Sequence, residues 1–220
     1  MSRINTVIFD MDGTVLDTLA DLSASVNYVL GQFHMPERSE SEYRQFFGNG
    51  IRYAFQCAVP EGTTEEQIDR MLPVFKEYYG KHWLDRTRPY AGVTDLMKHL
   101  KEKGYRLAIV SNKIDPAVKA LNERFFSAYV PVAIGEKAGI RRKPAPDTVE
   151  QALQELGSTK EEAVYIGDSE VDLETADHAG IPCITVLWGF RDRSFLAERG
   201  ATLFAETPAD VFDLIASICI

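Results

Sequence analysis

Residues 6–13 read TVIFDMDG, and this stretch decides the fold. Its first part, Thr6–Phe9, is a short and largely apolar run of the kind that forms a buried parallel strand. The run ends at Asp10, and Asp12 follows two positions later. Ligands of open α/β sheets bind beyond the carboxyl ends of the strands, so both carboxylates stand where a functional site is expected.

The rest of the chain repeats strands of this kind. Three further apolar runs and a weaker one occupy Leu107–Val110, Ala163–Ile166, Cys183–Leu187 and Tyr129–Ile134. Helical patterns alternate with them at Val93–Lys103, Pro116–Phe125, Asp147–Leu156 and Val171–Ala179. This alternation predicts an α/β fold with a doubly wound (Rossmann-like) parallel sheet and right-handed crossovers.

One long segment, residues 18–85, breaks the alternation. It carries helical periodicity, with an amphipathic pattern over Leu19–Phe33 and a second helix over Ile68–Trp83. Thr64 and Gln67 have the spacing of a capping box ahead of that second helix. The segment is too long for a simple crossover. We therefore predict a helical cap domain at 18–85, inserted into an α/β core of residues 1–17 and 86–220.

The composition narrows the possible partners. The chain has 220 residues and a formal net charge of −9, which disfavours nucleic acid and anionic membranes as partners. No apolar run approaches the length of a membrane span. Cys57, Cys183 and Cys219 are too widely spaced for a disulfide framework or a zinc site. We expect a cytoplasmic protein that is a monomer or a homodimer.

The strand ends carry the candidate chemistry. Asp10 and Asp12 can project from the same face, and two carboxylates this close repel unless a cation neutralises them or one holds a proton. Asp168 follows a neighbouring strand and can complete an oxygen-rich Mg²⁺ site. One carboxylate can then attack phosphorus while the other, protonated, serves the leaving group.

Other residues near the strand ends suit phosphate binding. Gly13 allows the backbone to approach a phosphate closely, and Thr14 can help to open a following helix. Ser111 offers a hydroxyl donor after its strand, and Lys143 offers a cation for phosphate oxygens. Asp172, one helical turn after the expected metal ligand, could hold Lys143 or a metal-bound water.

Four segments resemble, in the same order, the four motifs of the haloacid dehalogenase superfamily. They are DMDGTVLD at 10–17, VSN at 110–112, KP at 143–144 and GDSEVD at 167–172. The helical insert resembles the α-helical cap subclass of that family. Two further segments, Gly48–Gly50 and Trp188–Arg191, look like those of its phosphoglycolate phosphatase group.

The resemblance implies specific roles for these residues. Asp10 would be the nucleophile that forms an aspartyl-phosphate, and Asp12 the general acid/base. Mg²⁺ would be held by Asp10, the backbone carbonyl of Asp12 and Asp168. The phosphate would be bound by Ser111, Asn112 and Lys143. The implied activity is Mg²⁺-dependent hydrolysis of a small phosphorylated metabolite, a monoester such as 2-phosphoglycolate.

Arg52 is a candidate for substrate recognition in the cap. It lies in the helical pattern Ile51–Ala58, directly after the two glycines of Gly48–Gly50. A guanidinium there could pair bidentately with a carboxylate on the substrate. An ordinary solvated arginine fits the sequence equally well.

Three other functions share these motifs. A phosphomutase of the β-phosphoglucomutase type has the same core residues and differs in its cap contacts. A pyrophosphatase or nucleotidase can use the same core. A receiver-like phospho-acceptor module also places acids, a hydroxyl and a lysine at strand ends, but it needs neither a cap nor the leaving-group acid Asp12.

Overall fold

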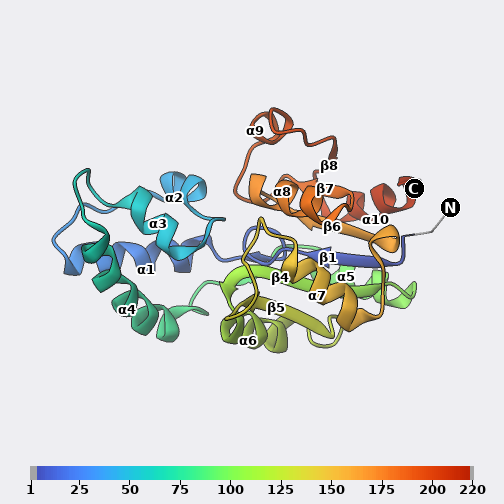
Figure 1. The fold of residues 1–220 in the computed structure, drawn as a ribbon, viewed down its shortest axis with the longest axis horizontal. Helices are drawn as coiled ribbons and strands as arrows, with labels where there is room; N and C mark the ends of the chain where they lie inside the picture. The colour runs from blue at the N-terminus through green and yellow to red at the C-terminus, as the bar shows by residue number, and fades with distance from the viewer. Residues whose placement is uncertain (1–3, 219–220) are drawn as a thin grey trace. The chain divides into compact units, whose positions relative to one another are not determined.

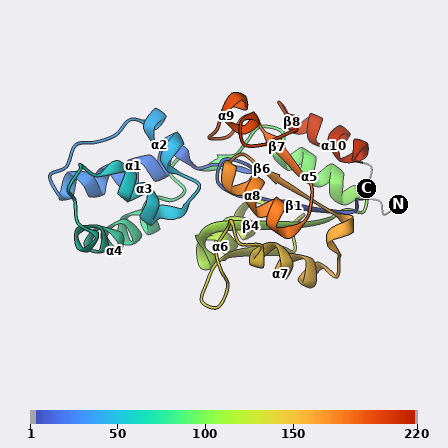
Figure 2. The same ribbon diagram turned by 45° about the horizontal axis from the view of Figure 1, so that its top comes forward.

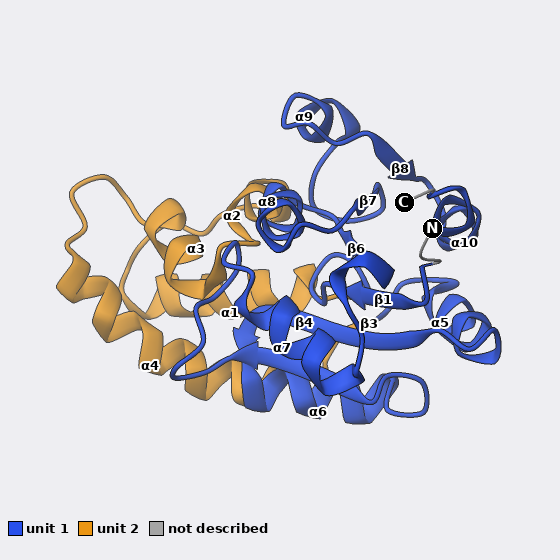
Figure 3. Cartoon of the chain, turned by 45° about the vertical axis from the view of Figure 1, so that its right-hand side comes forward, with its two compact units in different colours: residues 1–15, 89–220 blue, residues 16–88 orange. Residues whose placement is uncertain are grey.

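A computed structural model describes residues 4–218 of the chain. The chain divides into two compact units, residues 1–15 with 89–220 and residues 16–88, coloured separately in Figure 3. The sequence analysis placed the divisions at 17/18 and 85/86. Two short strands, β2 (Leu16–Asp17) and β3 (Arg88–Pro89), pair with each other at the boundary between the units.

The first unit is built on a six-stranded parallel sheet of order β5-β4-β1-β6-β7-β8 (Figure 1). The predicted doubly wound α/β fold is confirmed. Its strands are β1 (Thr6–Phe9), β4 (Arg106–Ile114), β5 (Val132–Glu136), β6 (Ala163–Gly167), β7 (Cys183–Val186) and β8 (Leu203–Ala205). The edge strand β8 was not predicted, because it is short and only partly buried.

Helices cover both faces of this sheet (Figures 1 and 2). The crossovers from β1 to β4 and β5 step in one direction, and those to β6 and β7 step in the other, so right-handed connections put their helices on opposite faces. The helices of this unit are α5 (Val93–Glu102), α6 (Asp115–Phe125), α7 (Asp147–Leu156), α8 (Glu170–Ala179), α9 (Arg193–Ala197) and α10 (Pro208–Ser217), with a 3₁₀ turn η1 (Lys160–Glu162).

The strand register brings the candidate site together. Phe9, the last residue of β1, lies opposite Ile109 of β4 and Ile166 of β6. All three side chains are buried in the core. The polar residues that follow these positions therefore meet at one edge of the sheet, which is the edge where doubly wound proteins bind ligands.

The second unit is helical apart from its short strands. It consists of α1 (Leu19–Gln32), α2 (Glu40–Phe46), α3 (Gly50–Ala58) and α4 (Glu65–His82). The predicted capping box of Thr64 and Gln67 is confirmed. The buried carboxylate of Asp21 on α1 accepts backbone hydrogen bonds from Arg86 and Thr87, which fastens the returning chain to the first helix.

The structure also bears on two expectations from the sequence, one on the cysteines and one on membrane-spanning segments. Cys57 and Cys183 are free thiols, whereas Cys219 lies outside the described residues. Burial raises the pKa of the Cys183 thiol, so it is held neutral. Within residues 4–218, no helix is both long enough and apolar enough to cross a bilayer.

Candidate active site

Three buried carboxylates converge at the carboxyl edge of the sheet. Asp10 follows β1, Asp168 follows β6, and Asp172 lies in the first turn of α8. One carboxylate oxygen from each lies within 4.8 Å of the others. Oxygen ligands gathered in this way are the donor set that Mg²⁺ and Ca²⁺ prefer.

Lys143 lies in the middle of these acids and is 3% exposed. Its Nζ donates to Asp10 Oδ1 at 2.6 Å, to Asp172 Oδ1 at 2.8 Å and to the Tyr165 hydroxyl at 2.9 Å. Burial disfavours the ammonium, but the two carboxylates outweigh it and raise the pKa of Lys143 above its ordinary value. Lys143 is therefore a charged group of the site and not a solvated surface lysine.

Asp172 is fully engaged by hydrogen-bond donors. Its Oδ1 accepts from Lys143 and from the Tyr165 hydroxyl, and its Oδ2 accepts from the backbone N–H of Asp168 and from both the N–H and the hydroxyl of Ser169. Burial works against ionisation, but these partners, led by Lys143, lower the pKa of Asp172. A carboxylate offers about four lone-pair sites, and five donors fill them. Of the two roles predicted for Asp172, the structure has the one in which it holds Lys143.

Asp10 and Asp168 keep lone pairs for a cation. Burial, with a further contribution from neighbouring carboxylates, raises the pKa of Asp10, although Lys143 opposes the shift. Burial and then the charge of Asp172 raise the pKa of Asp168 to about 7. Both carboxylates are thus costly to ionise without a further positive charge beside that of Lys143. The chemistry of these residues fits a divalent metal ion.

Asp12 has a partner that the sequence analysis did not anticipate. The Lys113 Nζ donates to both carboxylate oxygens of Asp12, at 2.9 and 3.1 Å. The Lys113 side chain is only 8% exposed and that of Asp12 only 19%. Lys113 directly follows the Ser111-Asn112 pair on β4, and this position was the only signal in the sequence.

Ser111 and Asn112 hold the strand end and the lysine loop in place. The Ser111 hydroxyl accepts the backbone N–H of Lys113 at 3.1 Å, which leaves its own proton for another acceptor. The Asn112 side-chain amide donates to the Lys143 carbonyl at 3.0 Å. Asn112 thereby connects β4 to the loop that carries Lys143. Direct phosphate contacts by Ser111 and Asn112 remain predictions.

Gly13 and Thr14 both contact Asp168. Gly13 has a φ of +92°, and a Cβ there would lie 2.3 Å from Asp168 Oδ2, so only glycine fits. The Thr14 hydroxyl donates to Asp168 Oδ1 at 3.0 Å. The expectation that Thr14 helps to open a following helix is wrong, because a turn follows β1 and the next helix begins at Leu19. Its hydroxyl positions Asp168 instead.

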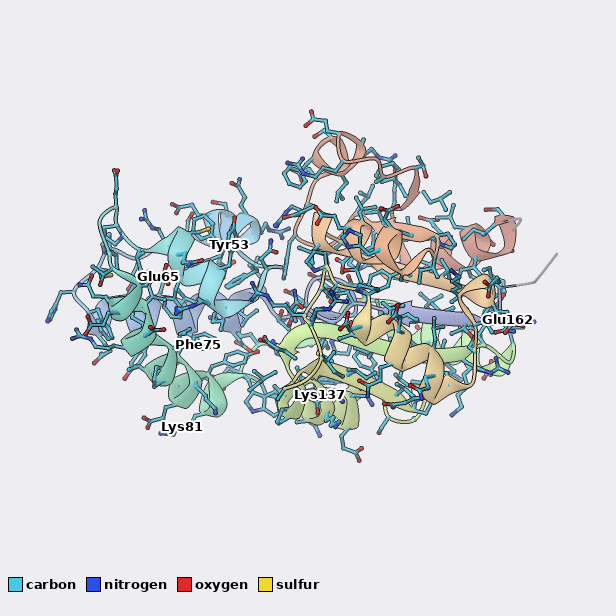
Figure 4. The ribbon with its side chains drawn as sticks, in the orientation of Figure 1. Tyr53, Glu65, Phe75, Lys81, Lys137 and Glu162 are labelled. Carbon is cyan, nitrogen blue, oxygen red and sulfur yellow. The ribbon has the colours of Figure 1, made fainter. Side chains whose placement is uncertain are left out.

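Arg52 lies on α3 and is paired within the helical unit. Its guanidinium contacts Asp69, and its Nη1 lies 3.3 Å from Glu65 Oε2. Glu65, labelled in Figure 4, stands at the start of α4. These pairs connect α3 to α4 and give Arg52 a structural use. A contact between Arg52 and substrate remains a prediction.

Comparison with known proteins decides the family. The model of the haloacid dehalogenase-like hydrolase family matches residues 7–186, most of the chain. The chain belongs to this family. The converging residues Asp10, Lys143, Asp168 and Asp172 all lie within the matched segment of this haloacid dehalogenase-like hydrolase.

Several relatives of this hydrolase carry more specific names. A phosphoglycolate phosphatase of Mesorhizobium japonicum is 31% identical over 85% of this chain and 84% of its own. A pyrophosphatase of Listeria monocytogenes is 30% identical over 97% of both chains. A crystal structure from Lactobacillus delbrueckii subsp. bulgaricus, provisionally named a phosphoglycolate phosphatase, is 39% identical over 97% of this chain and 98% of that one, with a TM-score of 0.92.

Proposed function

We propose that this protein is a Mg²⁺-dependent phosphatase that hydrolyses a small phosphate monoester through an aspartyl-phosphate on Asp10. One observation carries the proposal. Lys143 Nζ lies 2.6 Å from Asp10 Oδ1, in a buried cluster with Asp168 and Asp172. A nucleophilic carboxylate, a fixed ammonium and a cation-binding set of oxygens are the parts that phosphoryl transfer needs.

The chemistry proceeds in two steps. A carboxylate oxygen of Asp10 forms a bond to phosphorus while the bond from phosphorus to the ester oxygen breaks, and Asp12 gives that oxygen a proton. Asp12 then takes a proton from water, and the water oxygen forms a bond to phosphorus while the bond from phosphorus to the Asp10 oxygen breaks. Inorganic phosphate is released and the Asp10 carboxylate is regenerated. Ser111 and Lys143 donate to the phosphoryl oxygens during both steps.

The metal site would be formed by Asp10, Asp168 and the backbone carbonyl of Asp12. When bound, Mg²⁺ supplies positive charge that lets the acids and the phosphate dianion lie together. The side chains support this assignment. With all four acids of the site ionised, Asp10, Asp12, Asp168 and Asp172 would exceed its two lysines by two charges.

We assign the substrate to the class of short phosphate esters that carry a carboxylate, with 2-phosphoglycolate as the first candidate. The support is the phosphoglycolate phosphatase name of relatives in two comparisons. Pyrophosphate is the competing candidate, because the Listeria relative spans 97% of both chains. The hydrolase names of these relatives favour hydrolysis over a phosphomutase or a receiver-like module.

The test is a direct substrate comparison. Phosphate release is measured with Mg²⁺ from 2-phosphoglycolate, pyrophosphate, a nucleoside monophosphate and β-glucose 1-phosphate. We expect the highest kcat/KM for 2-phosphoglycolate, together with an acid-stable, hydroxylamine-sensitive phosphoenzyme that Asp10→Asn abolishes. A preference for pyrophosphate would indicate a pyrophosphatase like the Listeria relative. Formation of glucose 6-phosphate from glucose 1-phosphate would indicate a phosphomutase. Turnover by Asp10→Asn with deamidation excluded would refute the mechanism.

The cytoplasmic location and a monomeric or homodimeric state remain predictions. The location rests on the isolated cysteines, and sedimentation of the purified chain would measure its oligomeric state.

A further inference from the structure

The loop after β7, Trp188–Arg191, contacts Asp168 of the acidic cluster and the turn after β1. The backbone N–H of Phe190 donates to Asp168 Oδ2 at 2.6 Å. The indole Nε1 of Trp188 donates to the carbonyl of Thr14 at 2.9 Å. The loop therefore bonds both to the carboxylate that follows β6 and to the turn that follows β1.

Gly189, between these two donors, touches the same groups. A Cβ at this position would lie 2.3 Å from Asp168 Cβ, 2.4 Å from Asp168 Oδ2 and 2.4 Å from the Gly13 carbonyl oxygen. Two of these three atoms belong to a buried side chain and the third is backbone, so none can move aside cheaply. The loop backbone is thus packed directly against Asp168.

Arg191 anchors the end of the loop. Its Nε and Nη2 donate to the two carboxylate oxygens of Glu170, at 2.8 and 3.0 Å. The Arg191 side chain is 6% exposed, so this is a bidentate pair in a poorly solvated place. Glu170 begins α8, two residues after Asp168. Both ends of the loop are therefore held: Trp188 bonds to the turn after β1, and Arg191 pairs with the first residue of α8.

From these contacts we propose that the Trp188–Arg191 loop positions Asp168 for metal binding and thereby sets the metal affinity of the site. The inference rests on the proposed function, which makes Asp168 a ligand. Thr14 directs Asp168 Oδ1, and Phe190 directs Asp168 Oδ2. With both oxygens oriented, the remaining lone pairs point in fixed directions before a cation arrives. Partners of this kind typically change metal affinity by about ten- to a hundredfold when lost.

The test measures Mn²⁺ binding to the full chain by the loss of the free-ion EPR signal, without substrate. Trp188→Phe keeps an aromatic ring and removes the donor to Thr14, so we expect its Kd to rise about tenfold. Gly189→Ala should weaken binding further. Matched controls lie in the helical unit: Trp83→Phe, and Gly80→Ala, where a Cβ meets nothing within 4 Å. Both controls should bind Mn²⁺ like the wild type.

A second readout separates positioning from general damage. If Trp188→Phe acts through metal affinity, a higher Mg²⁺ concentration should restore its kcat, which a distorted fold would not allow. An unchanged Mn²⁺ Kd in folded Trp188→Phe, or a kcat that stays low at saturating Mg²⁺, would overturn the inference even if Gly189→Ala does not fold. A wild-type chain that binds no Mn²⁺ would overturn the proposed metal-dependent function and this inference with it.

Discussion

The metal-free protein should lose stability as the pH rises from about 4 to about 7, and the buried carboxyl groups of Asp168 and Asp10 should be the cause. Burial and the charge of Asp172 raise the pKa of Asp168 from 3.8 to about 7. In this window the folded chain therefore holds a proton that the unfolded chain has released. Stability falls with pH wherever the folded state binds more protons. The contribution is complete below the unfolded pKa and is lost as the pH passes the folded pKa.

The size of the effect follows from the shift. A pKa difference of about 3 units corresponds to a change on the order of 4 kcal/mol in the free energy of unfolding. Asp10 has a raised pKa as well and adds to the loss in the same direction. Asp172 has a lowered pKa, so its favourable contribution is already complete at the start of the window.

Urea unfolding in EDTA, at pH values from 4.5 to 7.5, measures this loss. Asp168→Asn is the matched control, because it keeps the side-chain shape without a titrating proton. We expect the stability of the wild type to fall relative to Asp168→Asn as the pH rises. Mg²⁺ at about a hundred times its Kd should then return roughly 2.7 kcal/mol to the wild type near pH 7.5.

Two results would contradict this reasoning. If the wild type and Asp168→Asn had parallel stability profiles in EDTA, Asp168 would not be one of the groups that titrate. If Mg²⁺ stabilised both proteins equally at pH 7.5, Asp168 would not contribute to the metal site.

Three further predictions concern individual side chains and the metal. EDTA should abolish phosphatase activity and Mg²⁺ should restore it, whereas Ca²⁺ should restore it poorly because its larger, looser shell misplaces the nucleophile; full activity of a metal-free sample would contradict this. Lys113→Met should lower kcat more for alkyl than for aryl phosphates, because Asp12 loses the partner that positions it, and Lys113→Arg should recover part of the loss; equal losses over a leaving-group series would argue against this. Arg52→Ala should raise KM for 2-phosphoglycolate about tenfold, roughly 1.4 kcal/mol, and leave p-nitrophenyl phosphate unaffected; if the two substrates respond alike, the pairs with Asp69 and Glu65 are the whole role of Arg52.

Most of the sheet could be predicted from the sequence because its central strands are buried on both faces. Strands such as Thr6–Phe9 and Ala163–Gly167 are buried throughout and largely apolar, and polar residues follow them, so both the strand and its functional end are visible. The edge strand Leu203–Ala205 lacks this contrast, because it is short and partly exposed. Similarly, α2 (Glu40–Phe46) was missed because it is short and buries only one residue, Tyr43.

The site residues that could be predicted are carboxylates directly after buried strands, because an acid at such a position has few structural roles. Asp10 and Asp168 were visible for that reason, and the structure places them together. Tyr165 and Phe190 were not visible. Tyr165 reads as one more core residue of its strand, and its hydroxyl matters only because Lys143, far away in the chain, lies 2.9 Å from it. Phe190 acts through its backbone N–H, which every residue except proline offers.

The concentration of negative charge at the site explains why its acids need partners that the sequence does not reveal. Four acids lie close together at one sheet edge, and three different sets of partners hold them. Lys143 lies between Asp10 and Asp172, and Lys113 pairs with Asp12. Within residues 4–218, the side chain of Asp168 accepts its hydrogen bonds from two neutral donors, the Thr14 hydroxyl and the Phe190 N–H, and the charge of Arg191 adds a smaller effect. Neutral donors can orient a carboxylate but cannot cancel its charge. Asp168 therefore lacks a lysine partner among the described residues, and a bound cation would supply the charge that its ionisation needs. Metal-binding measurements should accordingly respond to the loss of the loop that orients Asp168.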